Sequence, residues 1–182
     1  MFNARSIANK ISELHELLYS SSYDIYFVTE TWLHKGICTD LLDPNGQYIV
    51  LRNDHTISRG GGVCAFIRNA LRVVPKTFSD EFCDIEVTGF DVIASNTRAR
   101  FFVVYRPPKQ DVDAVKYMKK LVKCLSNYES KKYTNIILGD FNLPKIDWTN
   151  YTGDGHEVND IFLTFIIESG QWLLLACYPS DL

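Results

Sequence analysis

The sequence lacks the features that mark disulfide scaffolds, zinc modules and membrane proteins. It has no CxxC pair, and its five cysteines are odd in number and scattered, which argues against a zinc site or a disulfide framework. No apolar run approaches the roughly 20 residues of a membrane helix, and the N-terminus lacks the basic-then-apolar order of a signal peptide. We therefore expect free thiols, no membrane partner, and a reducing compartment inside the cell, either nuclear or cytoplasmic.

An excess of positive charge is also missing. The formal net charge is −3 at pH 7, so the chain has no global basic footprint for a polyanion. This disfavours a protein that binds nucleic acid through overall charge, but not an enzyme that grips a few phosphates locally. With 182 residues, 46% of them apolar, the chain is expected to form one globular domain over residues 1–182.

Hydrophobic periodicity predicts strands through the middle of the chain and helices nearer its ends. Apolar residues at helical spacing indicate helices over residues 6–19 (with Ser6 as its cap), 111–128 and 158–169. Strands are predicted within residues 23–32, 47–54, 59–69, 83–96, 99–108, 134–140 and 171–177. This order indicates an α/β or α+β layered domain with a largely mixed sheet.

Polar side chains interrupt the apolar strands at their ends. In open α/β sheets, ligands bind outside strand ends, where loops point side chains into a shared crevice. Two carboxylates with amides, from separate strands, suit a hard divalent cation such as Mg²⁺, which prefers oxygen ligands. Such a cation typically also takes a phosphate oxygen of the substrate. The residues at these strand ends are Asn3, Glu30, Tyr105, Arg106, Asp140 and Asn142.

Each of these residues also has an ordinary structural explanation. Glu30 could be a solvated strand end, and Tyr105 a half-buried ring with its hydroxyl in water. Asp140 and Asn142 could simply form a turn. The three glycines at 60–62 are best explained as a flexible or bulged strand start, because no Lys-Ser/Thr and no helix follow them. No histidine has a metal-ligand spacing to another, so all four are expected at the surface.

Five sequence blocks, taken in order, carry a resemblance to a known family. They are FNARSI at 2–7, DIYFVTETWL at 24–33, GGGVCAFIR at 60–68, VVYRPP at 103–108 and IILGDFNLPKIDW at 136–148. Together they closely resemble the endonuclease domain of non-LTR (LINE-type) retrotransposons, in the endonuclease/exonuclease/phosphatase superfamily. The resemblance spans nearly the whole chain, about residues 2–172.

The resemblance implies a four-layered α/β sandwich, in which two mixed sheets pack face to face with helices outside. It implies hydrolysis of a DNA phosphodiester with Mg²⁺ as cofactor and Mn²⁺ as an alternative. The reaction would nick double-stranded target DNA and leave a 3′-hydroxyl primer for a reverse transcriptase domain of the parent polyprotein.

The resemblance also assigns roles to residues that match the family motifs. Glu30 matches the metal-binding glutamate, and Asn3 the asparagine beside the metal. Tyr105 matches the tyrosine that hydrogen-bonds the scissile phosphate. Asp140 matches the aspartate that orients and deprotonates the attacking water, and Asn142 the asparagine that helps to hold that water and the phosphate.

The sequence departs from the family in one respect. The family uses a further aspartate and a histidine in a Ser-Asp-His motif beyond the GDFN block, and no Ser-Asp-His exists here. Ser180-Asp181-Leu182 only mimics it. We expect a domain truncated at both ends, lacking its first strand and its C-terminal strands. Because site residues act as a unit, we expect weak or no nuclease activity.

Two other readings stay open. One is a superfamily phosphoesterase that acts on another substrate, although the NARS and YRPP segments favour the retrotransposon branch. The other is a non-catalytic, retrotransposon-derived remnant that binds DNA through arginines. Its arginines would be Arg52, Arg59, Arg68, Arg98, Arg100 and Arg106.

Overall fold

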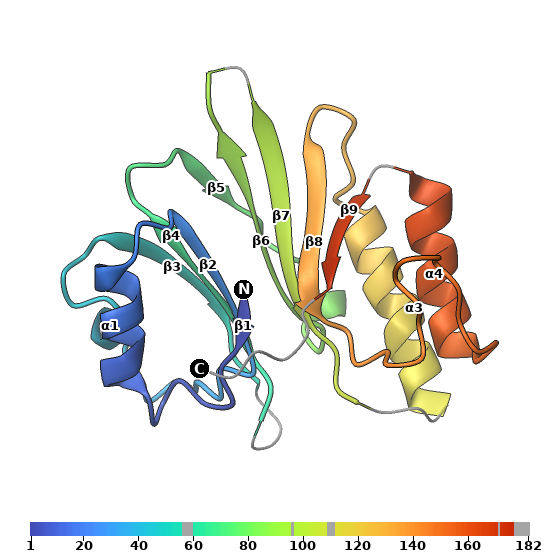
Figure 1. The fold of residues 1–182 in the computed structure, drawn as a ribbon, viewed down its shortest axis with the longest axis horizontal. Coiled ribbons are helices and arrows are strands. Elements are labelled where there is room, and N and C mark those ends of the chain that lie inside the picture. Colours follow the sequence, from blue (N-terminus) through green and yellow to red (C-terminus); the bar gives the residue numbers. More distant parts are fainter. Residues whose placement is uncertain (56–59, 96, 109–111, 171, 177–182) are drawn as a thin grey trace.

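Two β-sheets pack face to face, and helices cover the outer face of each (Figure 1). The computed structural model describes residues 1–55, 60–95, 97–108, 112–170 and 172–176. This arrangement confirms the predicted four-layered α/β sandwich with mixed sheets.

Residues 2–68 supply a four-stranded sheet, here called sheet A. Its strands, in spatial order, are β1 (Phe2–Asn3), β2 (Ile25–Thr29), β4 (Val63–Arg68) and β3 (Tyr48–Asn53). The pair β1–β2 is parallel, and the other two pairs are antiparallel. Since β1 and β2 are parallel, their carboxyl ends lie at the same edge of the sheet.

The rest of the chain forms a five-stranded sheet, here called sheet B. Its strands, in spatial order, are β5 (Val73–Pro75), β6 (Glu86–Ile93), β7 (Arg98–Tyr105), β8 (Thr134–Asp140) and β9 (Trp172–Ala176). The pairs β7–β8 and β8–β9 are parallel, whereas β5–β6 and β6–β7 are antiparallel. The carboxyl ends of β7 and β8 therefore also share one edge.

The helices lie on the outer faces of the two sheets. In Figure 1, α1 (Ile11–Ser20) and the single turn α2 (Thr39–Leu42) cover sheet A, and α3 (Val112–Ser126) and α4 (Glu157–Ser169) cover sheet B. A short 3₁₀ turn, η1 (Asp80–Phe82), precedes β6. Within the described residues, none of these helices combines the length and apolar character that crossing a bilayer demands.

Three separate apolar clusters lie between the four layers. The first joins α1 to sheet A through Leu14, Leu18 and Phe66. The second fills the space between the sheets and includes Phe27, Ala65, Phe90 and Val103. The third joins α3 and α4 to sheet B and includes Phe102, Met118, Leu121 and Phe162. Each fully buried side chain of this size contributes about 1.5–3 kcal/mol, so the layers are held mainly by apolar burial.

Strand β4 shows how the sequence encodes two of these clusters at once. Cys64 and Phe66 face α1, whereas Val63, Ala65 and Ile67 face sheet B. A strand buried on both faces has to be apolar at nearly every position, which is why VCAFI reads as a continuous apolar run.

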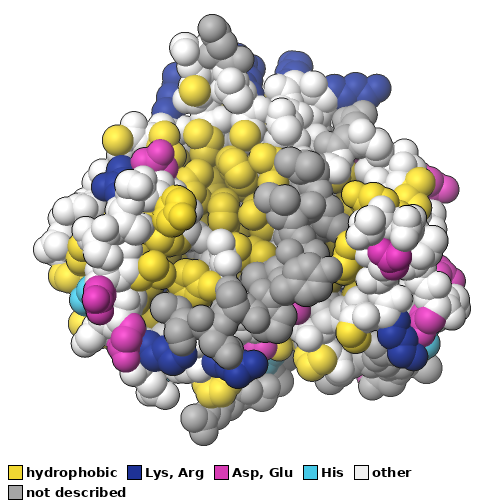
Figure 2. Space-filling model, in the orientation of Figure 1, with side chains coloured by type: hydrophobic (Ala, Val, Ile, Leu, Met, Phe, Trp, Pro, Cys, Tyr) yellow, Lys and Arg dark blue, Asp and Glu magenta, His cyan; other side chains and the backbone are white. Residues whose placement is uncertain are grey.

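The inter-sheet cluster is partly open to solvent on one side. Figure 2 shows hydrophobic side chains gathered at the surface in the region between the two sheets. Partly buried side chains that pack against this cluster include Ile25, Phe101 and Ile136. Large exposed apolar patches favour association, so this face is a liability for solubility.

The first helix begins later than the sequence pattern predicts. α1 starts at Ile11, with Lys10 at its N-cap, so the prediction that Ser6 caps a helix over 6–19 is wrong. The Ser6 amide donates to the Glu30 carbonyl (2.9 Å), and the Ile7 amide to the Thr31 carbonyl (2.8 Å). These bonds hold the segment in a non-helical path along the exit of β2, which overrides its helical periodicity.

The cysteines agree with the prediction of free thiols. Cys64 and Cys124 are buried, Cys38 and Cys83 are exposed, and all four are free. Burial raises the pKa of Cys124 to about 12, so this thiol stays protonated and unreactive at neutral pH. Cys177 lies outside the described residues.

A buried ion pair joins β6 to β7. It lies near the start of β7, at the opposite end of the strand from Tyr105. Arg100 makes two hydrogen bonds to its cross-strand partner Asp91 (2.6 and 2.9 Å), and Lys76 adds a third at 2.6 Å. Burial by itself would raise the pKa of Asp91, but the hydrogen bonds from Arg100 and then Lys76 outweigh it and lower that pKa. The ionised carboxylate therefore stabilises the fold.

We predict that Asp91→Asn lowers the free energy of unfolding by about 3 kcal/mol at pH 7, because it leaves the buried Arg100 without its counter-charge. Since the pKa of Asp91 is lowered on folding, its contribution is complete above the ordinary pKa of about 3.9 and is lost as pH falls through the lowered value. Urea unfolding of both proteins from pH 7 to pH 3 measures this. A difference that stays constant over this range would contradict the assignment.

Candidate active site

Three polar side chains lie in one row across the inner face of sheet B. Glu86 at the start of β6 is in register with Tyr105 at the end of β7, and Tyr105 is in register with Asp140 at the end of β8. Tyr105 belongs to the inter-sheet cluster, so the row points towards sheet A. The strand register thus places two carboxylates on either side of one phenol.

Sheet A brings two further polar side chains to the same edge. Asn3 ends β1 and pairs with Thr29, the last residue of β2, so Glu30 follows directly beside it. The Asn3 Nδ2 group donates to Glu30 Oε1 at 3.1 Å and to Asp140 Oδ2 at 3.3 Å. A single buried amide therefore joins a carboxylate of sheet A to a carboxylate of sheet B.

The sequence around Asp140 explains how this carboxylate is held. A Cβ at Gly139 would collide with the Val104 carbonyl oxygen of the neighbouring strand, so only glycine fits before Asp140. Phe141 points away from the inter-sheet face and packs against Phe162 of α4, with the rings tilted and their centroids 4.7 Å apart. The backbone amide of Asn142 donates to Asp140 Oδ1 at 3.1 Å. Asp140 thus forms a turn through one oxygen and faces Asn3 with the other.

Asn142 is fixed by the end of β7. Its Nδ2 group donates to the Arg106 carbonyl (2.6 Å). In return, Arg106 Nη1 donates to the carbonyls of Phe141 (3.2 Å) and Asn142 (3.1 Å), and the Arg106 amide donates to the Asp140 carbonyl (2.9 Å). Arg106 is only 1% exposed, so its role here is to brace the turn.

Strained backbone is concentrated at this edge. Among the described residues, the non-glycine residues with positive φ are Arg5, Ser6, Glu30, Trp32, Asn142 and Tyr151. All except Tyr151 lie on the turns that carry Asn3, Glu30 and Asp140. Such conformations cost on the order of 1 kcal/mol or more each and persist where the surrounding structure imposes them, often at functional sites.

The electrostatics of the site favour a neutral phenol and disfavour two bare carboxylates. Burial raises the pKa of Tyr105, and the nearby charges of Glu30, Asp140 and Glu86 raise it further, so its hydroxyl stays protonated as a donor. Burial also raises the pKa of Asp140; hydrogen bonds from Asn142 and Asn3 oppose this, and the charge of Glu30 adds to it. A cation bound between Glu30 and Asp140 would offset the repulsion between these two carboxylates and the negative charge around Tyr105.

The donor set suits a hard divalent cation. Mg²⁺ is usually held by one or two carboxylates, and water and phosphate oxygens complete its shell. Glu30 and Asp140 supply two carboxylates within reach of one amide group, and Asn3 ties them in place. The residues present therefore fit Mg²⁺ or Mn²⁺.

The structure brings together all five residues expected from the sequence: Asn3, Glu30, Tyr105, Asp140 and Asn142. It also adds one that the sequence analysis missed. Glu86 is 5% exposed, lies beside Tyr105, and pairs with His55 at 2.8 Å. A glutamate at the start of an apolar strand was the available signal. His55 is therefore partly buried rather than a surface histidine.

The arginines of the DNA-binding reading do not form one surface. Arg100 and Arg106 are buried, and Arg52 is bound to Asp54 (2.5 and 2.7 Å) and to the carbonyls of Ile37 and His34. Arg59 lies outside the described residues. The set as a whole therefore gives no support to a phosphate-binding patch.

Comparison with solved structures places this arrangement in a known fold. The endonuclease domain of TRAS1, a telomere-specific non-LTR retrotransposon, aligns with 92% of this chain and 68% of its own, with a TM-score of 0.61 and 13% identity. An AP endonuclease from Archaeoglobus fulgidus gives the same shares, a TM-score of 0.64 and 15% identity. The chain has the endonuclease/exonuclease/phosphatase fold.

A third structure with a similar fold was solved with nucleic acid. The 3′ phosphatase NExo from Neisseria, bound to product DNA hairpin, aligns with 80% of this chain and 58% of its own, with a TM-score of 0.59 and 16% identity. Residues 99–178 match the family model described as endonuclease-reverse transcriptase, and no curated protein matches the chain. The resemblance stated from the sequence is confirmed; the expectation of missing strands stays a prediction.

We predict that Asp140→Asn becomes more stable relative to the wild type as pH rises from about 3.5 to 7.5 in a chelating buffer. The pKa of Asp140 is raised on folding, so the stability tied to its protonated form is lost as pH rises through that value. The asparagine variant does not titrate there. Thermal melting of both proteins across this range checks the sign; a wild type that gains on the variant with rising pH would contradict it.

Proposed function

We propose that this chain is a Mg²⁺- or Mn²⁺-dependent phosphodiesterase that nicks double-stranded DNA. The observation that carries the proposal is the Asn3 amide, which joins Glu30 and Asp140 across the two sheets beside Tyr105. The fold shared with the TRAS1 endonuclease domain, and with a phosphatase solved with product DNA hairpin, supports DNA as the substrate.

Asp140 would act as the base that takes a proton from the attacking water. The ionised carboxylate only accepts hydrogen bonds. Its Oδ1 accepts from the backbone amide of Asn142, and its Oδ2 accepts from the side chain of Asn3. A carboxylate whose two oxygens are already oriented can align a water molecule and accept its proton.

Tyr105 and Asn142 would hold the phosphate and the water. The raised pKa of Tyr105 keeps its hydroxyl protonated, so it can donate to a non-bridging phosphate oxygen. The side-chain Nδ2 of Asn142 donates to the Arg106 carbonyl, which fixes the side-chain amide so that its Oδ1 can accept a hydrogen bond from the water. Attack at phosphorus would form a new P–O bond and break the P–O3′ bond.

Glu30 would hold the cation, oriented by Asn3. When bound, Mg²⁺ or Mn²⁺ supplies positive charge that offsets charge developing on the phosphate oxygens. The sequence has no Ser-Asp-His motif, so we expect turnover several orders of magnitude below that of an enzyme with the complete set.

The wider setting follows from the same family relationship. The matching family model is named for an endonuclease joined to a reverse transcriptase, and we propose that the parent protein carries one. The nick would then supply the 3′-hydroxyl primer. The free cysteines agree with a reducing compartment, nuclear or cytoplasmic.

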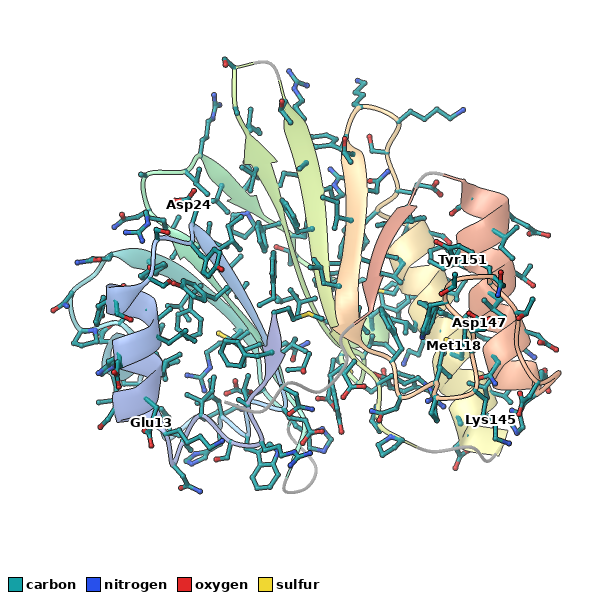
Figure 3. All side chains as sticks on the ribbon, in the orientation of Figure 1. Glu13, Asp24, Met118, Lys145, Asp147 and Tyr151 are labelled. Atoms are coloured by element: carbon teal, nitrogen blue, oxygen red, sulfur yellow. The ribbon has the colours of Figure 1, made fainter. Side chains whose placement is uncertain are left out.

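We predict slow, cation-dependent nicking of supercoiled plasmid under enzyme excess, reduced at least about 100-fold by Asp140→Asn and by Glu30→Gln. Glu13→Gln is the matched control, because Glu13 lies on α1, away from the strand-end site (Figure 3). Equal residual activity in Asp140→Asn and the wild type would show that another site, or a contaminant, does the cutting. Hydrolysis of a small phosphomonoester without any nicking would favour another phosphoester substrate.

We further predict that Mn²⁺ raises the melting temperature of the wild type but not of Glu30→Gln. A cation that binds only the folded chain stabilises it by about 1.4 kcal/mol at ten times its dissociation constant, and it relieves the repulsion between Glu30 and Asp140. Differential scanning fluorimetry against Mn²⁺ concentration measures the shift, with Glu13→Gln as control. Equal shifts in all three proteins would place the binding elsewhere.

A further inference from the structure

We propose that Glu86 is a positioning residue for the metal-binding Glu30 and acts through the glycine turn at 60–62. This inference rests on the proposed function, because it concerns the geometry of the same site. The residues that carry it come from three separate segments: the start of β6, the turn that leads into β4, and the turn that follows β2.

Glu86 grips the glycine turn directly. Its Oε2 accepts a short hydrogen bond from the Gly62 amide, and its Oε1 lies 2.8 Å from His55 Nδ1. The side chain is 7% exposed in this pair, so both carboxylate oxygens are committed in a nearly dry environment. Hydrogen bonds from an amide to a carboxylate are stronger than neutral ones, and burial strengthens them further.

Two carbonyl groups of the glycine turn accept hydrogen bonds from the residues that follow Glu30. The Thr31 amide donates to the Gly62 carbonyl at 3.3 Å, and the Trp32 amide to the Gly61 carbonyl at 3.0 Å. On its other side, the Glu30 carbonyl accepts from the Ser6 amide at 2.9 Å. Glu30 has φ 51°, a conformation that a glutamate does not hold unaided, so these neighbours are what keep it there.

The fit between Glu86 and the turn leaves no spare room. A Cβ at Gly61 would lie 2.5 Å from Glu86 Oε2, and the Gly61 φ of 69° also disfavours any other residue. This close approach explains the glycine at 61 without a phosphate-binding role. The turn is shaped to receive a carboxylate of this chain.

Two further hydrogen bonds fix the position of Glu86 relative to sheet A. The Asn53 Nδ2 group donates to the Ile85 carbonyl (3.1 Å) and to the Val87 carbonyl (3.0 Å), on either side of Glu86. Asn53 ends β3 and is in register with Val63, the residue after the glycine turn. Asn53 and Glu86 therefore lock the start of β6 to sheet A, at the opposite side of the site from Asn3.

The direct test compares Mn²⁺ affinity, measured by electron paramagnetic resonance of free Mn²⁺, in the wild type, Glu86→Ala, Glu86→Gln and Asp91→Asn. We expect Glu86→Ala to weaken binding about tenfold or more, the effect typical of residues that support a metal ligand. Glu86→Gln should bind nearly as the wild type, because its amide oxygen still accepts from Gly62. Asp91→Asn removes a buried carboxylate charge from the other end of the same strand; it should lower stability and leave Mn²⁺ affinity unchanged.

Glu86→Ala that binds Mn²⁺ as tightly as the wild type would overturn the proposal, as would an equal loss in Asp91→Asn. Should Glu86→Ala fail to fold, Glu86→Asp replaces it, because it keeps the charge but shortens the reach. Weaker binding in Glu86→Asp than in Glu86→Gln supports the contact with Gly62, and the reverse order contradicts it.

Hydrogen exchange separates this proposal from the proposed function. If the wild type shows no saturable Mn²⁺ binding, the metal site fails, but the amides of Thr31 and Trp32 still report on the turn. Faster exchange of these amides in Glu86→Ala than in Asp91→Asn supports positioning by Glu86. Equal exchange in the two variants rules it out.

Discussion

The hydrogen bonds of one side-chain amide link the two halves of this molecule at its candidate site. Asn3 Nδ2 donates to Glu30 of sheet A and to Asp140 of sheet B. Apolar packing holds the sheets face to face, but it does not fix their register to a fraction of an ångström at a given edge. Directional bonds at the edge do so: those of Asn3 on one side, and those of Asn53 and Glu86 on the other.

The local structure of the candidate site lowers the stability of the fold. Two carboxylates lie close together in a partly buried place, and the turns that carry them have left-handed backbone at Glu30 and Asn142. Apolar burial in three clusters supplies the stability that these local conflicts consume. An arrangement of this kind persists where function requires it, since a simple strand end would need neither the strain nor the buried charge.

Sequence reasoning reached most of the fold because the strands and α3 and α4 have strong periodicity. The apolar runs at 25–29, 63–67 and 101–105 are strands, as predicted. The strand-end rule, together with the family motifs, also selected Asn3, Glu30, Tyr105, Asp140 and Asn142, which the structure brings to one edge. The cap at Ser6 was wrong, because backbone bonds to Glu30 and Thr31 are tertiary contacts that local periodicity does not encode. Glu86 was missed for the same reason, since its partners Gly62 and His55 are distant in sequence.

We propose that Glu30 and Asp140, joined by Asn3, form a cation site between the two sheets. Paramagnetic broadening by substoichiometric Mn²⁺ in an amide nuclear magnetic resonance spectrum tests it most directly, because it locates the cation without requiring activity. We expect the signals of Asn3, Glu30 and Asp140 to broaden first, while those of Asp91 and Arg100, at the other end of β6 and β7, stay sharp. Early broadening at exposed carboxylates such as Glu157, with the signals of Asn3 unchanged, would contradict it.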